Sequence, residues 1–228
     1  MMPETILASR SAKATPRRVP RNPSAAAPED MREALLRLKR ERIVAAAVEL
    51  FDRQGYARTT LDEVADAIGM TKPFIYQFFK SKNEILADIC SRAIRLAHVS
   101  LDRAIAQQGS PAARLHTIVR DFMQAVLEHQ AHASIYSREE KELLPSDREA
   151  INALRRKFDR RLVAIIEAGV ASGEFQVEDV DMAALAVGGI IGWSPVWYRP
   201  RGRLTREEVC EKAANLALAM VRANPSRR

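Results

Sequence analysis

The stretch 71–82, TKPFIYQFFKSK, brings together side chains that could contact the edges of base pairs in duplex DNA. Lys72 could donate to guanine O6 or N7, and Gln77 could bond adenine N6 and N7. Phe74 could press on a thymine methyl group, and Thr71 is a further base-edge candidate. These residue types at close spacing indicate sequence reading by direct contact.

A second group could contact phosphates, which fixes position without reading sequence. It comprises the amide-rich helix start at Thr60, the Tyr76 hydroxyl and the Lys82 ammonium. A cation in the first turn of a helix opposes the helix dipole, so Lys82 suggests that an anion binds there. The complete set of candidate DNA-contacting residues is Thr60, Thr71, Lys72, Pro73, Phe74, Tyr76, Gln77, Phe78 and Lys82.

Packing is the alternative for the aromatic and aliphatic members of this stretch. We favour packing for Ile75 and Phe79, whereas Phe78 is balanced between packing and DNA contact.

Nothing in the sequence indicates catalysis. His129 and His132 have no second cluster to complete a metal site, and a surface pair is the better interpretation. Cys90 and Cys210 lack metal-type spacing and suit reduced thiols in a cytoplasmic protein. We expect no catalytic residue, no metal and no cofactor.

Local signals predict the helices that position these side chains. Thr60 with Glu63, and Ser81 with Glu84, read as capping boxes, and Gly69 stands where helices end in a left-handed residue. Thr71 can cap a helix over 72–79, because proline is tolerated in a first turn. Two short helices joined by a glycine-containing turn are the helix-turn-helix layout.

The segment GMTKPFIYQFFKSKNEIL, preceded by TLDEVADAI and AAAVELFDRQGY, resembles the DNA-binding domain of TetR-family transcriptional regulators. The resemblance covers roughly residues 40 to 86. Pro73 and Phe74 stand where the family often has a small residue and threonine, and Lys80 replaces a common proline. The resemblance implies a helix-turn-helix regulator that binds a palindromic double-stranded operator as a homodimer.

Charge is unevenly distributed along the chain of 228 residues, whose net charge is +7. Residues 1–28 contain five prolines and five basic residues against one acidic residue, which predicts a disordered basic arm. The arm could contact phosphates, or it could be a solubilising tail. Residues 29–82 hold ten basic and nine acidic residues, so DNA binding there cannot depend on bulk charge.

Apolar periodicity and further caps predict an all-α protein of about nine helices. Ser146 with Glu149, Asp181, and Thr205 with Glu208 read as later helix starts. We expect a three-helix DNA-binding domain over 29–82 and an effector-binding and dimerisation domain over 83–224. No run of 18 or more apolar residues occurs, so no membrane span is expected. The expected helices span 29–54, 61–68, 72–79, 83–108, 111–130, 134–143, 146–173, 182–193 and 205–223.

The helix over 182–193 is apolar nearly all round and rich in small residues, which predicts a close helix–helix seam. Together with the last helix it could form half of a four-helix bundle between two protomers; the alternative is burial within one subunit. The candidate dimer residues are Leu185, Gly188, Gly189, Gly192, Val209, Ala213, Leu216, Ala217 and Met220.

The stretch 192–209 more loosely resembles the C-terminal region of TetR-family repressors of fatty-acid, steroid or acyl-CoA catabolism. This resemblance implies a small, largely apolar effector, with an acyl-CoA as a candidate. The candidate lining residues, each with simple core packing as its alternative, are Phe122, Met123, Val126, Leu127, Tyr136, Phe158, Leu162, Ile166, Trp193 and Trp197.

The sequence thus favours a repressor that an effector releases from its operator. The alternatives are an activating or effector-independent DNA-binding regulator, and a helical ligand-binding module without DNA function.

Overall fold

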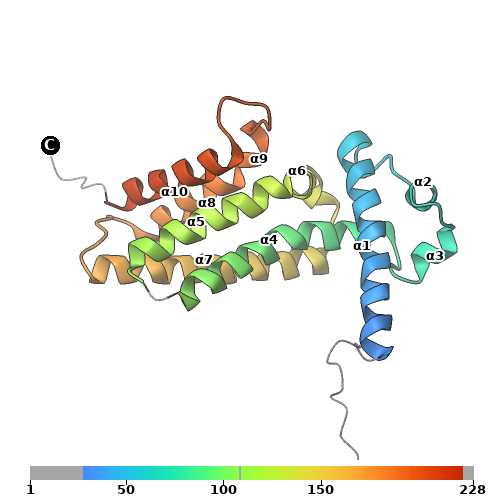
Figure 1. Ribbon diagram of the computed structural model, residues 1–228, viewed down its shortest axis with the longest axis horizontal. Helices are drawn as coiled ribbons and strands as arrows, with labels where there is room; N and C mark the ends of the chain where they lie inside the picture. The colour runs from blue at the N-terminus through green and yellow to red at the C-terminus, as the bar shows by residue number, and fades with distance from the viewer. Residues whose placement is uncertain (1–27, 108, 223–228) are drawn as a thin grey trace, which may run out of the picture. The chain divides into compact units, whose positions relative to one another are not determined.

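The computed structural model describes residues 28–107 and 109–222, and every regular element in that part of the chain is a helix (Figure 1). This confirms the all-α prediction. The predicted arm over 1–28 lies almost entirely outside the described residues. The helices are α1 Pro28–Gln54, α2 Leu61–Ala67, α3 Lys72–Tyr76, α4 Lys82–Ala106, α5 Pro111–Glu128, α6 Gln130–Glu139, the 3-10 helix η1 Glu140–Glu142, α7 Pro145–Ala171, α8 Val180–Gly192, α9 Ser194–Trp197 and α10 Arg206–Arg222.

Several helix ends form as their residues predict. The Thr60 hydroxyl accepts from the Glu63 amide at 3.2 Å, and the Glu63 carboxylate accepts from the Thr60 amide at 2.7 Å. Thr205 and Glu208 repeat this reciprocal pair at α10. Gly69 has φ +68° beyond the end of α2, and its amide donates to the Asp66 carbonyl. Only glycine adopts that conformation without steric cost, which explains the tight turn into α3.

Other predicted caps are wrong or incomplete. Ser146 lies inside the first turn of α7, because Pro145 starts that helix one residue earlier. At α8 the capping carboxylate is that of Asp179, which accepts from the Met182 amide at 2.9 Å, so Asp181 is not the cap.

The turn around α3 shows two smaller differences. The Thr71 side chain makes no capping hydrogen bond, although its backbone is extended at the cap position. The Glu84 carboxylate accepts from the Lys80 amide at 2.6 Å, so Ser81 and Glu84 form only half of a capping box. Helix α3 also ends at Tyr76 rather than Phe79, because the Phe78 amide bonds to the carbonyl three residues back.

The chain divides after Arg37 into two units, and the second unit contains two clusters of buried apolar residues. The first cluster belongs to what we call the reading head, residues 38–90, and includes Phe51, Ile75 and Phe79. Ile135 and Ile151 from α6 and α7 complete it, so its packing crosses the predicted domain boundary at residue 82. The second cluster joins α4, α5, α7, α8 and α10.

One window in the described residues, Val180–Trp197, has the length and composition of a membrane span, with mean hydropathy 1.3. Its helix is interrupted, because α8 ends at Gly192 and Pro195 lies at the start of α9. Thirteen residues of α8 extend about 20 Å, well short of a hydrocarbon core of about 30 Å. One side of α8 also packs into the second cluster through Ala184, Val187 and Ile191.

Candidate nucleic-acid interface and ligand cavity

Helix α3 has one buried side and one exposed side. Ile75 is fully buried and Phe79, just beyond the helix, is 1% exposed, which agrees with the packing role favoured for both. Thr71, Pro73, Tyr76 and Gln77 are exposed. The buried pair fixes the helix against the reading head and leaves the other side available for DNA.

The two remaining aromatic residues of this stretch are half-buried. The Phe74 and Phe78 rings lie 5.2 Å apart between centroids and pack beside the core of the reading head. The Lys39 ammonium lies 5.8 Å from the centre of the Phe74 ring. Phe78 therefore combines packing with partial exposure, and Phe74 keeps only part of its surface for a base.

The Lys72 ammonium forms an ion pair with Asp62 of α2, with 2.8 Å between nitrogen and oxygen. The hydrogen bond to Asp62 raises the pKa of Lys72, so the side chain stays charged at neutral pH. The pair is solvent-exposed, and such pairs contribute little to stability. A guanine acceptor could compete with Asp62 for this ammonium.

Lys82 is placed differently from its prediction. Its ammonium donates to the carbonyl oxygens of Thr59 at 2.7 Å, Tyr56 at 2.8 Å and Ala57 at 3.4 Å, and it lies over the Tyr56 ring. Partial burial lowers the pKa of Lys82. The partner that compensates this cation is therefore the turn between α1 and α2, and its phosphate contact remains a prediction.

A network that the sequence analysis missed connects α1 to α4. Asp88, largely buried, pairs with Arg40 at 3.4 Å, Arg92 at 3.0 Å and Arg95 at 3.3 Å. Arg92 also pairs with Glu41 at 2.7 Å. The spacing of Asp88 and Arg92 was the only local signal.

Arg40 reaches further toward the recognition segment. It donates to the Phe78 carbonyl at 3.1 Å and lies 4.1 Å from the centre of the Phe79 ring. It thereby holds the end of the α3 turn against α1 and α4.

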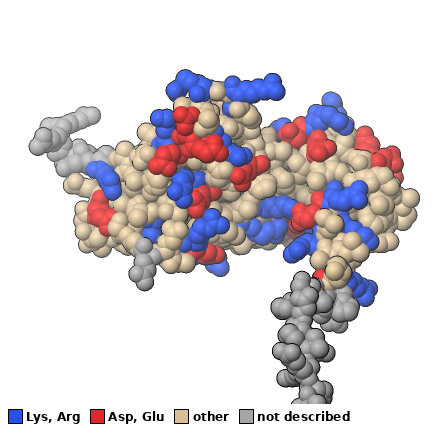
Figure 2. Space-filling view, viewed as in Figure 1, with Lys and Arg blue, Asp and Glu red and all other residues tan. Residues whose placement is uncertain are grey.

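Figure 2 shows basic and acidic side chains intermingled over the face in view, without a broad field of one sign. This matches the near balance of charge over residues 29–82. On a surface of mixed charge, DNA binding depends on specific contacts more than on bulk attraction.

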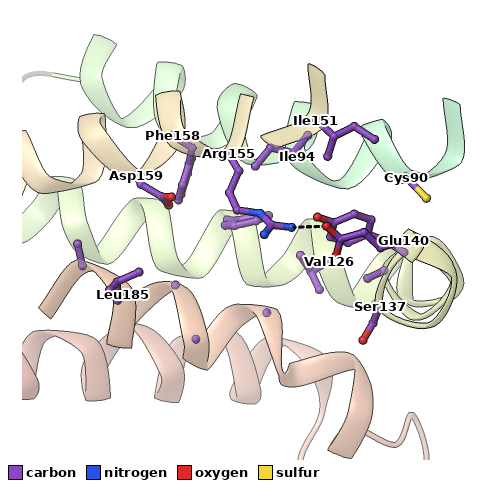
Figure 3. Close-up of a pocket in the computed structure, with 17 residues that line it drawn as sticks. Cys90, Ile94, Val126, Ser137, Glu140, Ile151, Arg155, Phe158, Asp159 and Leu185 are labelled. Carbon is purple, nitrogen blue, oxygen red and sulfur yellow. Dashed lines mark ion pairs between the residues drawn. The ribbon is translucent and has the colours of Figure 1, made fainter. Parts of the chain in front are cut away.

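A cavity of about 420 Å³ lies among α4, α5, α6, α7 and α8 (Figure 3). Four of the predicted residues line it: Phe122, Val126, Tyr136 and Phe158. Its polar residues include Arg155 and Glu140, whose charged groups lie 3.9 Å apart, and Asp159. Burial raises the pKa of Asp159, and the buried Tyr136 hydroxyl has no hydrogen-bond partner among the described residues. The cavity suits an apolar molecule with few polar groups.

The other predicted lining residues lie elsewhere. Core packing explains four of them, which are buried but do not line the cavity: Met123, Leu127, Leu162 and Ile166. Trp193 and Trp197 are 62% and 48% exposed and do not line it either. Pro195 starts a new helix between the two indoles, which leaves both on the surface.

The predicted seam residues also separate into groups. Leu185, Gly188, Gly189 and Gly192 line the cavity from α8, which the sequence analysis did not anticipate. Figure 3 shows Leu185 on the α8 side of the cavity. Leu216 and Met220 are exposed on α10.

Three seam candidates on α10 differ from their prediction because the protomer itself covers them. Val209 and Ala213 are about 5% exposed and Ala217 is fully buried in the second cluster.

Helix α6 lines the cavity and also packs against the reading head. Arg138 donates to Asp52 Oδ1 at 3.2 Å and to the Phe51 carbonyl at 3.3 Å, at the C-terminal end of α1. The Asn83 amide group donates to the Glu142 carbonyl at 2.6 Å and accepts from the Leu144 amide. These contacts connect α6 and the segment after it to the end of α1 and the start of α4.

His129 and His132 lie with ring centroids 5.5 Å apart, and the described residues contain no group of three or more His, Cys, Asp or Glu arranged to hold a metal ion. Burial, followed by the nearby His129 and Arg92, lowers the pKa of His132 to about 4. It is therefore a neutral, packed histidine at physiological pH.

Comparison with known proteins gives two family matches. Residues 43–89 match the model of bacterial regulatory proteins of the tetR family, and residues 108–221 match the tetracyclin repressor-like C-terminal domain. The chain is 25% identical over 182 residues to the HTH-type transcriptional repressor KstR2 of Mycolicibacterium smegmatis, covering 79% of this chain and 89% of that protein.

Solved structures of similar regulators also align with this chain. The TetR-family regulator PfmR from Thermus thermophilus aligns with a TM-score of 0.72 and 30% identity, over 78% of this chain and 97% of that one. AibR, solved with isovaleryl coenzyme A and operator DNA, aligns with a TM-score of 0.69 and 25% identity, over 81% and 98% of the two chains.

These relatives are regulators rather than enzymes, and the two matched models together cover most of the reading head and the cavity-lining helices α5, α6, α7 and α8. The chain therefore belongs to the TetR family of bacterial transcriptional regulators.

Proposed function

We propose that the protein is a homodimeric transcriptional repressor that binds a palindromic operator and leaves it when a small, largely apolar effector occupies the cavity. The observation that best supports DNA binding is that α3 has one buried side and one exposed side. Ile75 and Phe79 anchor it, while Thr71, Tyr76 and Gln77 stay exposed. A helix held this way can enter a major groove without unfolding its supports.

A second copy of the chain is needed because one reading head makes a small interface. Two-fold pairing would place two recognition helices about 34 Å apart, one turn of DNA. The exposed apolar residues of α8 and α10, together with Trp193 just after α8, supply the surface for pairing, and they include Met182, Leu185 and Leu216.

The cavity supports effector control. Apolar residues dominate its wall, and Arg155, Glu140 and Asp159 supply its charged groups. An acyl-CoA is a reasonable candidate, since the related AibR was solved with isovaleryl coenzyme A. A ligand can change operator affinity only if it binds the two protein states with different affinity.

Operator binding tests the proposal directly. The full chain would be titrated into labelled DNA from upstream of its own gene at fixed salt, with and without acyl-CoAs of increasing chain length. Binding to a palindrome that is lost with an acyl-CoA is expected. Binding unaffected by every acyl-CoA would favour an effector-independent regulator, and no binding at low salt would leave only a ligand-binding module.

Activation is the specific alternative to repression. The activator FasR of Mycolicibacterium smegmatis is 30% identical over 93 residues, which cover 41% of this chain. A reporter gene fused to the bound operator separates the two, because deletion of a repressor raises expression and deletion of an activator lowers it.

A further inference from the structure

Where α6 packs against α9, the cavity has a neighbouring depression. This second depression of about 400 Å³ shares Ala133, Ser137 and Gly192 with it. The shared residues make the two spaces neighbours along one side of α6. A ligand that extends past these shared wall residues would enter the second space.

The two spaces differ in charge. The first contains Glu140 and Asp159 against the single cation Arg155. The described lining of the second contains Arg138 and Arg199 and no carboxylate, with amide and hydroxyl groups from Gln130, Ser134 and Ser137. An anionic group would be repelled in the first space and attracted in the second.

Both guanidinium groups have donors to offer. Arg199 uses Nη1 for the carbonyls of Val196 at 3.0 Å and Tyr198 at 2.9 Å, which leaves its Nε and Nη2 protons. Arg138 makes three contacts of 3.2 to 3.5 Å with Phe51 and Asp52, all through Nη2. Its pair with Asp52 is about half exposed on both sides, and such pairs are weak. An anion can therefore compete with Asp52 for Arg138.

We propose that the effector is an amphiphile whose apolar part fills the first cavity and whose anionic group binds Arg138 and Arg199 in the second. This inference rests on the proposed effector-controlled regulator. Binding of the anion takes Arg138 from Asp52 and from the Phe51 carbonyl at the end of α1. The effector and the reading head thus compete for one guanidinium group, and this competition couples the two sites.

A ligand panel of equal chain length tests the charge requirement. Octanol fills the apolar space without a charge, octanoate adds a carboxylate, octanoyl-CoA adds phosphates, and CoA alone lacks the chain. We expect calorimetry on the full chain to show octanoate or octanoyl-CoA binding at least about tenfold tighter than octanol. The tighter of the two identifies the anion as carboxylate or phosphate.

Three variants test the residues. Arg138→Gln and Arg199→Gln should each weaken the tighter anionic ligand about tenfold and leave octanol binding unchanged. Asp52→Asn should tighten the anionic ligand about two- to fivefold, because it removes the competitor. Arg138→Gln and Asp52→Asn both break the same contact, so a purely structural role would move ligand affinity in the same direction in both. Arg201→Gln, an exposed arginine outside both spaces, is the matched control.

The outcomes separate this inference from the proposed function. Octanol binding as tightly as both anionic ligands would overturn the anion site and leave an apolar effector cavity intact. Equal shifts in Arg138→Gln and Asp52→Asn would overturn the competition. If no member of the panel bound while the chain still bound an operator, both the anion site and the amphiphile would be excluded.

Discussion

Replacing Gly189 by leucine should separate the dimer while leaving the protomer folded. A Cβ atom built at Gly189 meets no atom within 4 Å, so the protomer has room for a side chain there. Leucine is also the better helix former by about 1 kcal/mol. Within one protomer the change is therefore neutral or stabilising.

At an interface between the α8 helices of two protomers, the same substitution weakens association. Leu185 and Trp193 lie one turn to either side of Gly189 and are 63% and 62% exposed. Burying a side chain that is about 60% exposed contributes about 1–2 kcal/mol. Loss of both contacts from both copies would cost about 4–8 kcal/mol, which raises the dimer dissociation constant at least about a thousandfold.

Sedimentation velocity over a range of concentrations measures this constant, and thermal unfolding checks the protomer. Ala164→Leu on the exposed face of α7 is the control, since it adds similar apolar surface outside the proposed seam. A Gly189→Leu protein that sediments as the same dimer with the wild-type constant would refute the close approach of α8 helices.

Three further predictions concern individual side chains. Lys82→Ala should lower the free energy of unfolding by about 1–3 kcal/mol, measured in urea, because carbonyls of the α1–α2 turn lose their donor. If the variant also keeps the wild-type slope of operator affinity against salt, Lys82 is not a phosphate contact. His132→Gln should reduce the loss of stability between pH 6.5 and 4, measured by denaturant titration at each pH. His132 takes up a proton near pH 6.5 in the unfolded chain, whereas burial lowers its pKa to about 4 in the folded chain. Stability therefore falls as the pH is lowered from 6.5 to 4. A His132→Gln variant whose stability depends on pH as the wild type does would contradict this. Burial raises the pKa of Cys90 to about 12 and that of Cys210 to about 11, so iodoacetamide at pH 8 should label neither until the chain unfolds, and rapid labelling seen by mass spectrometry would count against their burial.

The sequence predicted those features that depend on residues close together in the chain. Thr60 and Glu63 cap α2 because their spacing alone brings hydroxyl and carboxylate to the free amides. Gly69 ends α2 for an equally local reason, its positive φ. Ile75 and Phe79 are buried, which agrees with the packing role favoured for both.

Features that depend on distant parts of the chain escaped prediction. The acceptors of Lys82 are carbonyls some 25 residues away, and no side-chain pattern marks a carbonyl. An apolar stripe shows that a face is covered but not what covers it, so Val209 and Ala213 were assigned to a seam although their own protomer buries them. Only the i, i+4 spacing to Arg92 marked Asp88 in the sequence, and nothing indicated that Arg40 and Arg95 converge on it as well.

Helix α4 is rooted in both buried clusters, through Ile85 and Ile89 at its start and Leu101 and Ala104 toward its end. Its 25 residues make a rigid rod about 37 Å long. If the end of α4 near Ala104 stays fixed in the second cluster, a tilt of only about 5° displaces its first residues by about 3 Å, close to the 3.4 Å step between stacked base pairs. A small rotation of α4 is thus enough to move the adjoining recognition helix by about one base-pair step.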